Sequence, residues 1–233
     1  MQRISRIDLF WILFAAGMMA IAVTLLTQKF NALPALEASR GASVKLAVAE
    51  LDSYHYRAAR RILSPLAHAG NVQAETWLGY LDANGLGTSP NATEGVAWYE
   101  KAAGSGDVLA DRRLGQLYLN GTGVLQNVEQ AREWLQRAAV GGDPVSQRLL
   151  GELYAKGLGV PKDATRAYAW LDLAASRGDN LAARERDALL PSLSPSELSQ
   201  AAYLAQNGSQ TSNVKPPGEA SQTKLAANIA AAR

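Results

Sequence analysis

Apolar residues recur through the middle of this chain with the spacing of amphipathic helices, and the whole pattern repeats every 36 residues. The first helix of each unit is expected to bury Ala74, Leu78, Leu81 and Asp82, then Ala110, Leu114, Leu117 and Tyr118, then Ser146, Leu150, Leu153 and Tyr154. The second is expected to bury Gly95, Trp98, Tyr99 and Ala102, then Ala131, Trp134, Leu135 and Ala138, then Ala167, Trp170, Leu171 and Ala174. Self-similarity at a fixed period of this length predicts stacked helical hairpins.

Glycine and short polar residues indicate where these helices begin and end. The first helix of each unit is expected to end in a left-handed turn at Gly85, Gly121 and Gly157. The second helices are expected to start after the N-caps Asn91, Asn127 and Asp163, and the first helices after Asn71, Asp107, Asp143 and Asp179. The Gly-x-Gly pairs between the two helices lack the strand and third glycine of a phosphate-binding loop, so we interpret them as turns.

Two positions inside the first helices predict how closely neighbouring helices approach. Glycine recurs there at Gly79, Gly115 and Gly151. Because glycine costs about 1 kcal/mol relative to alanine in a helix, its recurrence indicates a close helix contact. Asp82 stands where the other units have tyrosine, which predicts looser packing in the first unit.

The pattern divides the chain into an anchor, a solenoid and a tail. We expect an N-terminal tail and transmembrane helix over 1–30, a spacer over 31–42, and a solenoid over 43–206. The solenoid is divided into a cap hairpin (43–70), three repeats (71–106, 107–142 and 143–178) and C-terminal capping helices (179–206). The last of these helices should start at Ser194, with Pro195 at its first position and Glu197 completing a capping box. Residues 207–233, rich in Gly, Ser, Pro and Gln, are expected to be disordered.

Residues 9–26 form an uncharged apolar stretch of 18 residues. As a helix it would rise about 27 Å, near the thickness of a bilayer core. We favour an uncleaved anchor, the alternative being a signal peptide cut near Ala32 to Ala35. Arg3 and Arg6 before the stretch place the amino terminus in the cytoplasm and the repeats in the periplasm. Ala16 and Ala20 leave a face small enough for homo-association, although we favour the ordinary use of small residues in a spanning helix as their explanation.

Composition restricts the chemistry that this chain can perform. A net charge of +2 with 19% charged residues does not suggest a nucleic-acid partner. The absence of cysteine excludes thiolate chemistry, and only His55 and His68 could supply an imidazole. We interpret His55 as part of a turn and His68 as a residue near a helix C-terminus. No catalytic residue, metal site or cofactor is therefore expected.

The motif LGxLYxxGxGV, followed by Ala-x-x-Trp-x-x-x-Ala-Ala-x-x-Gly-Asp, closely resembles the Sel-one-like repeat (SLR) family, a branch of the tetratricopeptide-like solenoids. The resemblance covers residues 74–182, with a looser match over 43–71. It implies an all-α fold, a right-handed α/α solenoid, whose inner surface is lined by the first helix of each repeat and binds other proteins. In such a fold Trp98, Trp134 and Trp170 are structural core residues rather than a ligand cage.

The residues expected to contact a partner lie on the first helices, on the stripe opposite the core: Tyr80, Arg112, Gln116, Arg148 and Glu152. Trp77 and Arg113 lie at the border of this stripe, where either could pack or contact a ligand. Arg112 and Arg148 lie one period apart, so their guanidinium groups could together bind a peptide carboxylate or carbonyl-rich segment. The alternative is a solvated face in which Arg148 pairs with Glu152.

We therefore expect a non-enzymatic adaptor in the bacterial inner membrane, holding protein partners beside a complex for secretion, polysaccharide export or signalling. One alternative is a regulator that restrains a membrane sensor. Another is a cell-wall hydrolase, which would need a convergent acid–base pair that the pattern does not supply.

Overall fold

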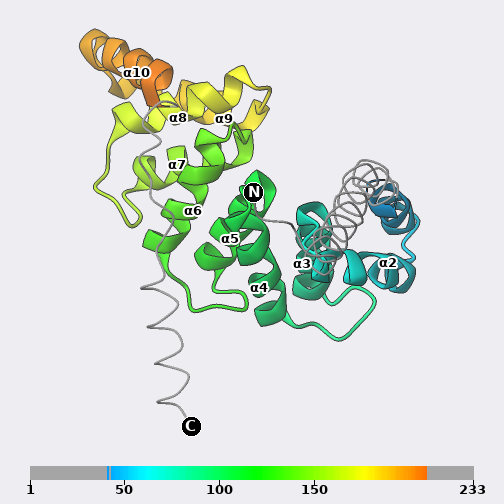
Figure 1. The fold of residues 1–233 in the computed structure, drawn as a ribbon. Coiled ribbons are helices and arrows are strands. Elements are labelled where there is room, and N and C mark those ends of the chain that lie inside the picture. Colours follow the sequence, from blue (N-terminus) through cyan, green and yellow to red (C-terminus); the bar gives the residue numbers. More distant parts are fainter. Residues whose placement is uncertain (1–40, 42, 209–233) are drawn as a thin grey trace, which may run out of the picture.

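The computed structural model describes residues 41 and 43–208, and in this part of the chain every regular element is a helix. Residues 43–52 are helical. The elements that follow are α2 Tyr56–His68, α3 Val72–Asn84, α4 Ala92–Gly104, α5 Val108–Asn120, α6 Val128–Val140, α7 Pro144–Lys156, α8 Ala164–Ser176, α9 Asn180–Leu189, the 3-10 turn η1 Leu190–Ser192 and α10 Pro195–Gly208. The helices follow one another from α2 to α10 along a single stack (Figure 1). We call 43–52, α3, α5, α7 and α9 the A helices, and α2, α4, α6 and α8 the B helices.

The helix ends form as the capping residues predict. Before α3, α5 and α7, the side chains of Asn71, Asp107 and Asp143 accept a hydrogen bond from the backbone N–H three residues on. Asn91, Asn127 and Asp163 do the same for α4, α6 and α8. α3, α5 and α7 end at Gly85, Gly121 and Gly157, whose φ values of 66°, 68° and 71° lie in the left-handed region. Local sequence therefore fixes the length of each helix.

The buried face of each B helix is centred one residue beyond the tryptophan. Tyr99, Leu135 and Leu171 are at most 2% exposed. Trp134 is just buried, whereas Trp98 and Trp170 are partly exposed and pack against the edges of core clusters. The tryptophans therefore occupy matching positions at the border of the core. Lys101 lies over the ring of Trp98 and Arg137 over that of Trp134, at 5.1 and 4.8 Å.

The glycines inside the A helices allow the close contact that their recurrence predicts. A Cβ at Gly115 would lie 2.6 Å from Leu135 Cγ, and one at Gly151 would lie 2.6 Å from Leu171 Cγ. In the first full repeat the equivalent neighbour is Tyr99, 3.0 Å from a Cβ at Gly79. There the B helix also has a glycine, Gly95, whose Cβ would lie 2.7 Å from the backbone nitrogen of Ala83. The first repeat thus accommodates Tyr99, which is larger than the leucines of the other repeats, because a second position, Gly95, also lacks a side chain.

A ladder of buried polar residues joins successive hairpins, and the hydrophobic pattern did not reveal it. At one position of α3, α5 and α7 stand Glu75, Asp111 and Gln147, all at most 4% exposed. In each repeat a cation at the end of the B helix reaches this residue. The contacts are Lys101 Nζ to Glu75 Oε1 at 2.9 Å, Arg137 Nη2 to Asp111 Oδ1 at 3.2 Å and Arg177 Nη1 to Gln147 Oε1 at 3.3 Å.

The same ladder binds the preceding hairpin through backbone carbonyl groups one period apart. Lys101 Nζ donates to the carbonyl of Ala67 at 3.2 Å and Arg137 Nη2 to that of Ala103 at 2.8 Å. At the third joint Gln147 Nε2 donates to the carbonyl of Ala139 at 2.9 Å. The polar ladder therefore connects three helices at each joint and satisfies carbonyls near a B-helix C-terminus.

Asp82 stands where the other repeats have tyrosine, and this difference predicted looser packing in the first repeat. The structure instead buries Asp82. Its carboxylate is fully buried and forms an ion pair with Arg60 of α2. The expectation of looser packing overlooked this partner, which stands 22 residues earlier in the chain. At this joint a charge pair takes the place of an aromatic ring.

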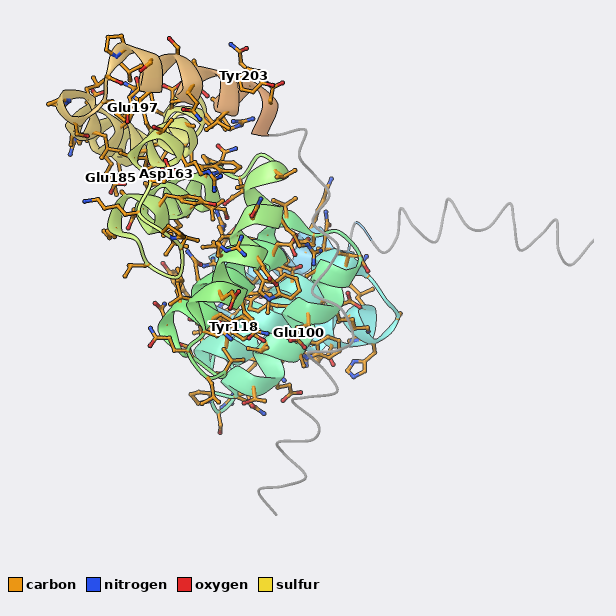
Figure 2. All side chains as sticks on the ribbon, turned by 90° about the vertical axis from the view of Figure 1, so that its left-hand side faces the viewer. Glu100, Tyr118, Asp163, Glu185, Glu197 and Tyr203 are labelled. Atoms are coloured by element: carbon orange, nitrogen blue, oxygen red, sulfur yellow. The ribbon has the colours of Figure 1, made fainter. Side chains whose placement is uncertain are left out.

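The C-terminal end of the stack is covered by α9 and α10. Ser194 and Glu197 form the predicted capping box, since Ser194 N–H donates to Glu197 Oε2 at 2.8 Å and Glu197 N–H donates to Ser194 Oγ at 3.3 Å. α10 packs against α8 and buries Ala201 completely, while Tyr203 stays 65% exposed at this end of the molecule (Figure 2). The helix continues to Gly208, two residues beyond its predicted end at 206.

Several expectations concern residues outside the described part of the chain. These are the transmembrane helix over 9–26, the small face at Ala16 and Ala20, the spacer over 31–40, and the tail from 209 onward. Among the described residues, no helix is both long and apolar enough to span a bilayer.

The close contact between α3 and α4 predicts opposite effects for two glycine substitutions in α4. Gly95→Ala places a Cβ within 2.9 Å of two backbone atoms, so overpacking should lower the free energy of unfolding by about 1–3 kcal/mol. Gly104→Ala meets no atom within 4 Å, so it should be neutral or slightly stabilising. Urea unfolding followed by circular dichroism measures both. Equal stability of the two variants would contradict the packing described here.

The burial of Asp111 predicts a specific pH dependence of stability. Desolvation raises the pKa of this carboxyl to about 7, although Arg137 opposes the rise. The folded chain therefore holds a proton that the unfolded chain releases near pH 4. Stability from this group is full below that pH and is lost as the pH rises through about 7, at up to roughly 1.4 kcal/mol per pH unit. Asp111→Asn, which mimics the protonated form, should have a flatter stability profile between pH 4 and 8. Parallel profiles for the two proteins would refute this assignment.

Candidate functional site

A hollow of about 460 Å³ opens on the A-helix face in the middle of the stack. Side chains from three successive A helices line it: Tyr80, Ala83 and Asn84 from α3, Arg113, Gln116, Leu117, Leu119 and Asn120 from α5, and Leu149 from α7. Tyr99 of α4 contributes to its floor. Because three repeats contribute, stacking the hairpins creates this site.

The repeat period explains why these residues meet. Tyr80 and Gln116 occupy one position of successive A helices, and Asn84 and Asn120 occupy another, just before the glycine that ends each helix. Arg113 and Leu149 share a third position, which Trp77 occupies in α3. Stacked repeats place equivalent residues side by side, so the hollow presents an aromatic side, a polar centre and an apolar side.

Among the described residues, Arg113 is the only charged side chain that lines the hollow. Its guanidinium lies 5.8 Å from the centre of the Tyr80 ring and donates to Gln116 Oε1 at 3.3 Å. Within residues 43–208 no carboxylate lies at ion-pair distance from it. A cation–π contact holds the group over Tyr80 while leaving several N–H donors for another acceptor.

Tyr99 supplies a neutral phenol near this cation. Burial raises its pKa above the ordinary value, and the nearby Arg113 guanidinium only partly offsets that rise. The hydroxyl therefore remains protonated at physiological pH. The hollow contains one fixed positive charge among neutral groups, which suits binding of a ligand rather than proton transfer.

Arg112 and Arg148 lie at the joints between repeats rather than in the hollow. Arg112 Nη1 contacts Asp143 Oδ1 at 3.0 Å and Arg148 Nε contacts Asp179 Oδ2 at 3.1 Å. Asp143 and Asp179 are the N-caps of the next A helices, so each arginine connects neighbouring units. Thr76, at the equivalent position of α3, is 4% exposed. This position of the A helices faces the adjoining repeat because hairpins in a stack are covered on two sides.

Trp77 and Glu152, the remaining predicted partner-contacting residues, do not line the hollow. Trp77 packs edge-to-face on Tyr80, with ring centres 6.0 Å apart. Glu152 accepts from Arg148 at 2.6 Å and Lys156 at 3.0 Å, so the alternative pairing of Arg148 with Glu152 is present. Three of the seven expected residues, Tyr80, Arg113 and Gln116, line the hollow.

Sequence reasoning missed Asn84, Asn120 and Leu149 as lining residues. The repeat period contained a usable signal for Leu149, which stands one period after Arg113. The two asparagines are exposed at the hollow's edge, and Asn84 donates to the carbonyl of Tyr80 at 2.7 Å.

The two histidines lie away from this site. His55 Nδ1 is 3.0 Å from Glu50 Oε2 on an exposed turn, beside a second hollow of about 590 Å³ that also contains Tyr54 and Arg61. His68 Nδ1 lies 2.7 Å from the carbonyl of Ser64, near the end of α2. Among the described residues, no group of three or more histidine or acidic side chains is arranged to hold a metal ion.

Comparison with known proteins agrees with this geometry. Residues 72–107, 108–143 and 144–179 each match the Sel1 repeat. The crystal structure of a Sel1 repeat protein from Oxalobacter formigenes is similar, with a TM-score of 0.59 and 31% identity over 61% of this chain and 59% of that one. A protective antigen present in uropathogenic Escherichia coli strains, which displays an SLR fold, gives a TM-score of 0.60 and 34% identity over 64% of this chain and 32% of that one.

This chain therefore spans less than two thirds of the length of either relative. No curated protein matches its sequence. The three consecutive matches and the similar solved structures agree with the helical hairpins and their 36-residue period. They identify residues 72–179 as three consecutive Sel1 repeats.

Proposed function

We propose that this chain is a non-enzymatic adaptor that binds a segment of another protein in the hollow on its A-helix face. Sel1 repeat proteins mediate protein–protein interactions in general. The observation that supports this particular site is the convergence of three A helices on one hollow with aromatic, amide, cationic and apolar groups. Such a mixture suits an extended peptide, which presents backbone amides and alternating side chains together.

The proposal includes attachment of the adaptor to the bacterial inner membrane. The 18 uncharged residues over 9–26 support a single anchor, and the short stretch over 31–42 would keep the repeats near the bilayer. Arg3 and Arg6 support a cytoplasmic amino terminus and periplasmic repeats. In this arrangement the adaptor would hold its partner beside an envelope complex for secretion, polysaccharide export or signalling.

Site-specific photo-crosslinking tests the location of the partner site. A photoreactive residue at Gln116 should crosslink a distinct protein in native membranes, because Gln116 lines the hollow. The same residue at Ala97, exposed on α4, serves as the matched control and should not capture that protein. Gln116→Trp should block capture by a probe at Asn120, at the hollow's edge. Equal capture from positions 116 and 97 would exclude the hollow as the docking site.

Two fusions test the anchor and its orientation. A phosphatase that is active only in the periplasm, joined after Arg233, should show activity in intact cells. The same fusion lacking residues 1–30 should be inactive and should appear in the soluble fraction, because it has lost the apolar stretch. An inactive full-length fusion that stays in the membrane fraction would reverse the orientation. Membrane association of the truncated fusion would exclude the anchor.

A further inference from the structure

The charges around the hollow limit the chemistry of a docked segment. At the joints, the charges of Arg112 and Arg148 are neutralised by carboxylates of the same chain. Arg113, next to Arg112 in sequence, donates to an amide oxygen and lies over a tyrosine ring, and no carboxylate within residues 43–208 is at ion-pair distance from it. It is half-buried, and no acidic side chain of the described part of the chain lines the hollow. A guanidinium in this position gains most from an anionic acceptor supplied from outside.

We propose that the docked segment is an extended peptide that places an aspartate or glutamate on Arg113, with an apolar side chain on either side of it. This inference rests on the adaptor function and adds the chemistry of the partner. The carboxylate would receive charge-assisted hydrogen bonds from the guanidinium that Tyr80 and Gln116 already orient. Because the group is held beforehand, less side-chain entropy is lost on binding.

The residues one period before and after Arg113 determine where the apolar side chains of the docked peptide are expected to bind. Trp77 precedes Arg113 by one period and Leu149 follows it, so the cation lies between an aromatic and an aliphatic position. Neighbouring packed helices lie about 10 Å apart. An extended peptide advances about 3.3 Å per residue. The expected ligand thus has apolar residues about three positions before and after the acidic residue.

Peptide backbone groups find partners at the edge of the hollow. Asn84 and Asn120 are exposed there, one repeat apart. Each carboxamide offers two N–H donors and an accepting oxygen, so Asn84 keeps capacity beyond its bond to the Tyr80 carbonyl. The hollow's one guanidinium among neutral groups does not suit a nucleic acid, whose binding depends on many cations.

Charge complementarity favours a partner over this chain's own C-terminal residues. Residues 209–233 carry Lys215, Lys224 and Arg233 but a single acidic side chain, Glu219. A segment with this excess of positive side chains is poorly matched to Arg113. The proposed occupant is therefore an acidic segment of a different protein.

Selection of random twelve-residue peptides, displayed on phage, against the full chain in detergent tests the inference. Peptides recovered on the wild type should be enriched in Asp or Glu, with apolar residues about three positions away on both sides. Selection on Arg113→Gln should lose the acidic enrichment. Arg132→Gln is the matched control, because Arg132 of α6 also donates to a glutamine, Gln136, and lies outside the hollow. It should retain the enrichment.

A double-substitution cycle on one recovered peptide tests the contact itself. Replacing its acidic residue with the corresponding amide should weaken binding to the wild type about tenfold, the usual scale for a charge-assisted hydrogen bond. Arg113→Gln should weaken binding of the acidic peptide by a similar factor, and the two losses should not multiply when combined. Multiplying losses would show that the acidic residue binds elsewhere, which overturns the inference.

The hollow-blocking variant Gln116→Trp separates failure of this inference from failure of the proposed function. The equivalent position of α3 is already aromatic, Tyr80, so the substitution should leave the circular dichroism spectrum unchanged. Peptides that lose binding to this variant but show no acidic preference would overturn the inference and support the adaptor function. Recovered peptides that all bind this variant normally would overturn both. Arg113-dependent binding of a synthetic 209–233 peptide would replace the external partner with the chain's own tail.

Discussion

Each hairpin in this chain has an apolar face that only the adjoining hairpins can cover. The A and B helices of a hairpin approach closely at Gly115 and Gly151, where a Cβ would collide with a buried leucine. The next hairpin then covers the apolar surface that the first leaves exposed, as in any linear array whose units contact only their neighbours. The hollow depends on this constraint, because residues from α3, α5 and α7 line it. Displacing one hairpin would therefore move the residues that this hairpin contributes to the hollow.

The sequence was sufficient to predict most of the fold for a physical reason. Helix length depends on short-range contacts, such as the bond from Ala110 N–H to the Asp107 side chain at 2.7 Å. Residues three apart in the sequence suffice to identify such a cap. Tight helix contacts were also predictable, because a glycine recurring inside a helix is unfavourable without a packing reason. Asp82 was the exception, since its partner Arg60 lies in another helix and no local pattern connects them.

The candidate site was predicted less well because neighbouring residues on a helix point about 100° apart. Arg112 and Arg113 are adjacent in sequence, but only the second lines the hollow while the first is paired across a joint with Asp143. Periodicity locates the core face, yet it does not show how much of the opposite face a neighbouring repeat covers. Glu75 and Asp111 were missed for a related reason, since a buried acid is identified only when the cation from the next helix is placed beside it.

Along the polar ladder, the backbone geometry of the joints repeats while the charge of the central side chain changes. Its central residue is Glu75 at the first joint, Asp111 at the second and Gln147 at the third, and a cation reaches each of them. At the first joint the buried carboxylate of Glu75 depends on Lys101, since a buried charge without a partner is costly. At the second joint, burial raises the pKa of Asp111 although Arg137 opposes the rise. The neutral glutamine avoids that cost and itself donates to a carbonyl of the preceding hairpin. The charge at successive joints therefore changes along the stack although their backbone geometry repeats, and the hollow spans three repeats whose joints differ in charge.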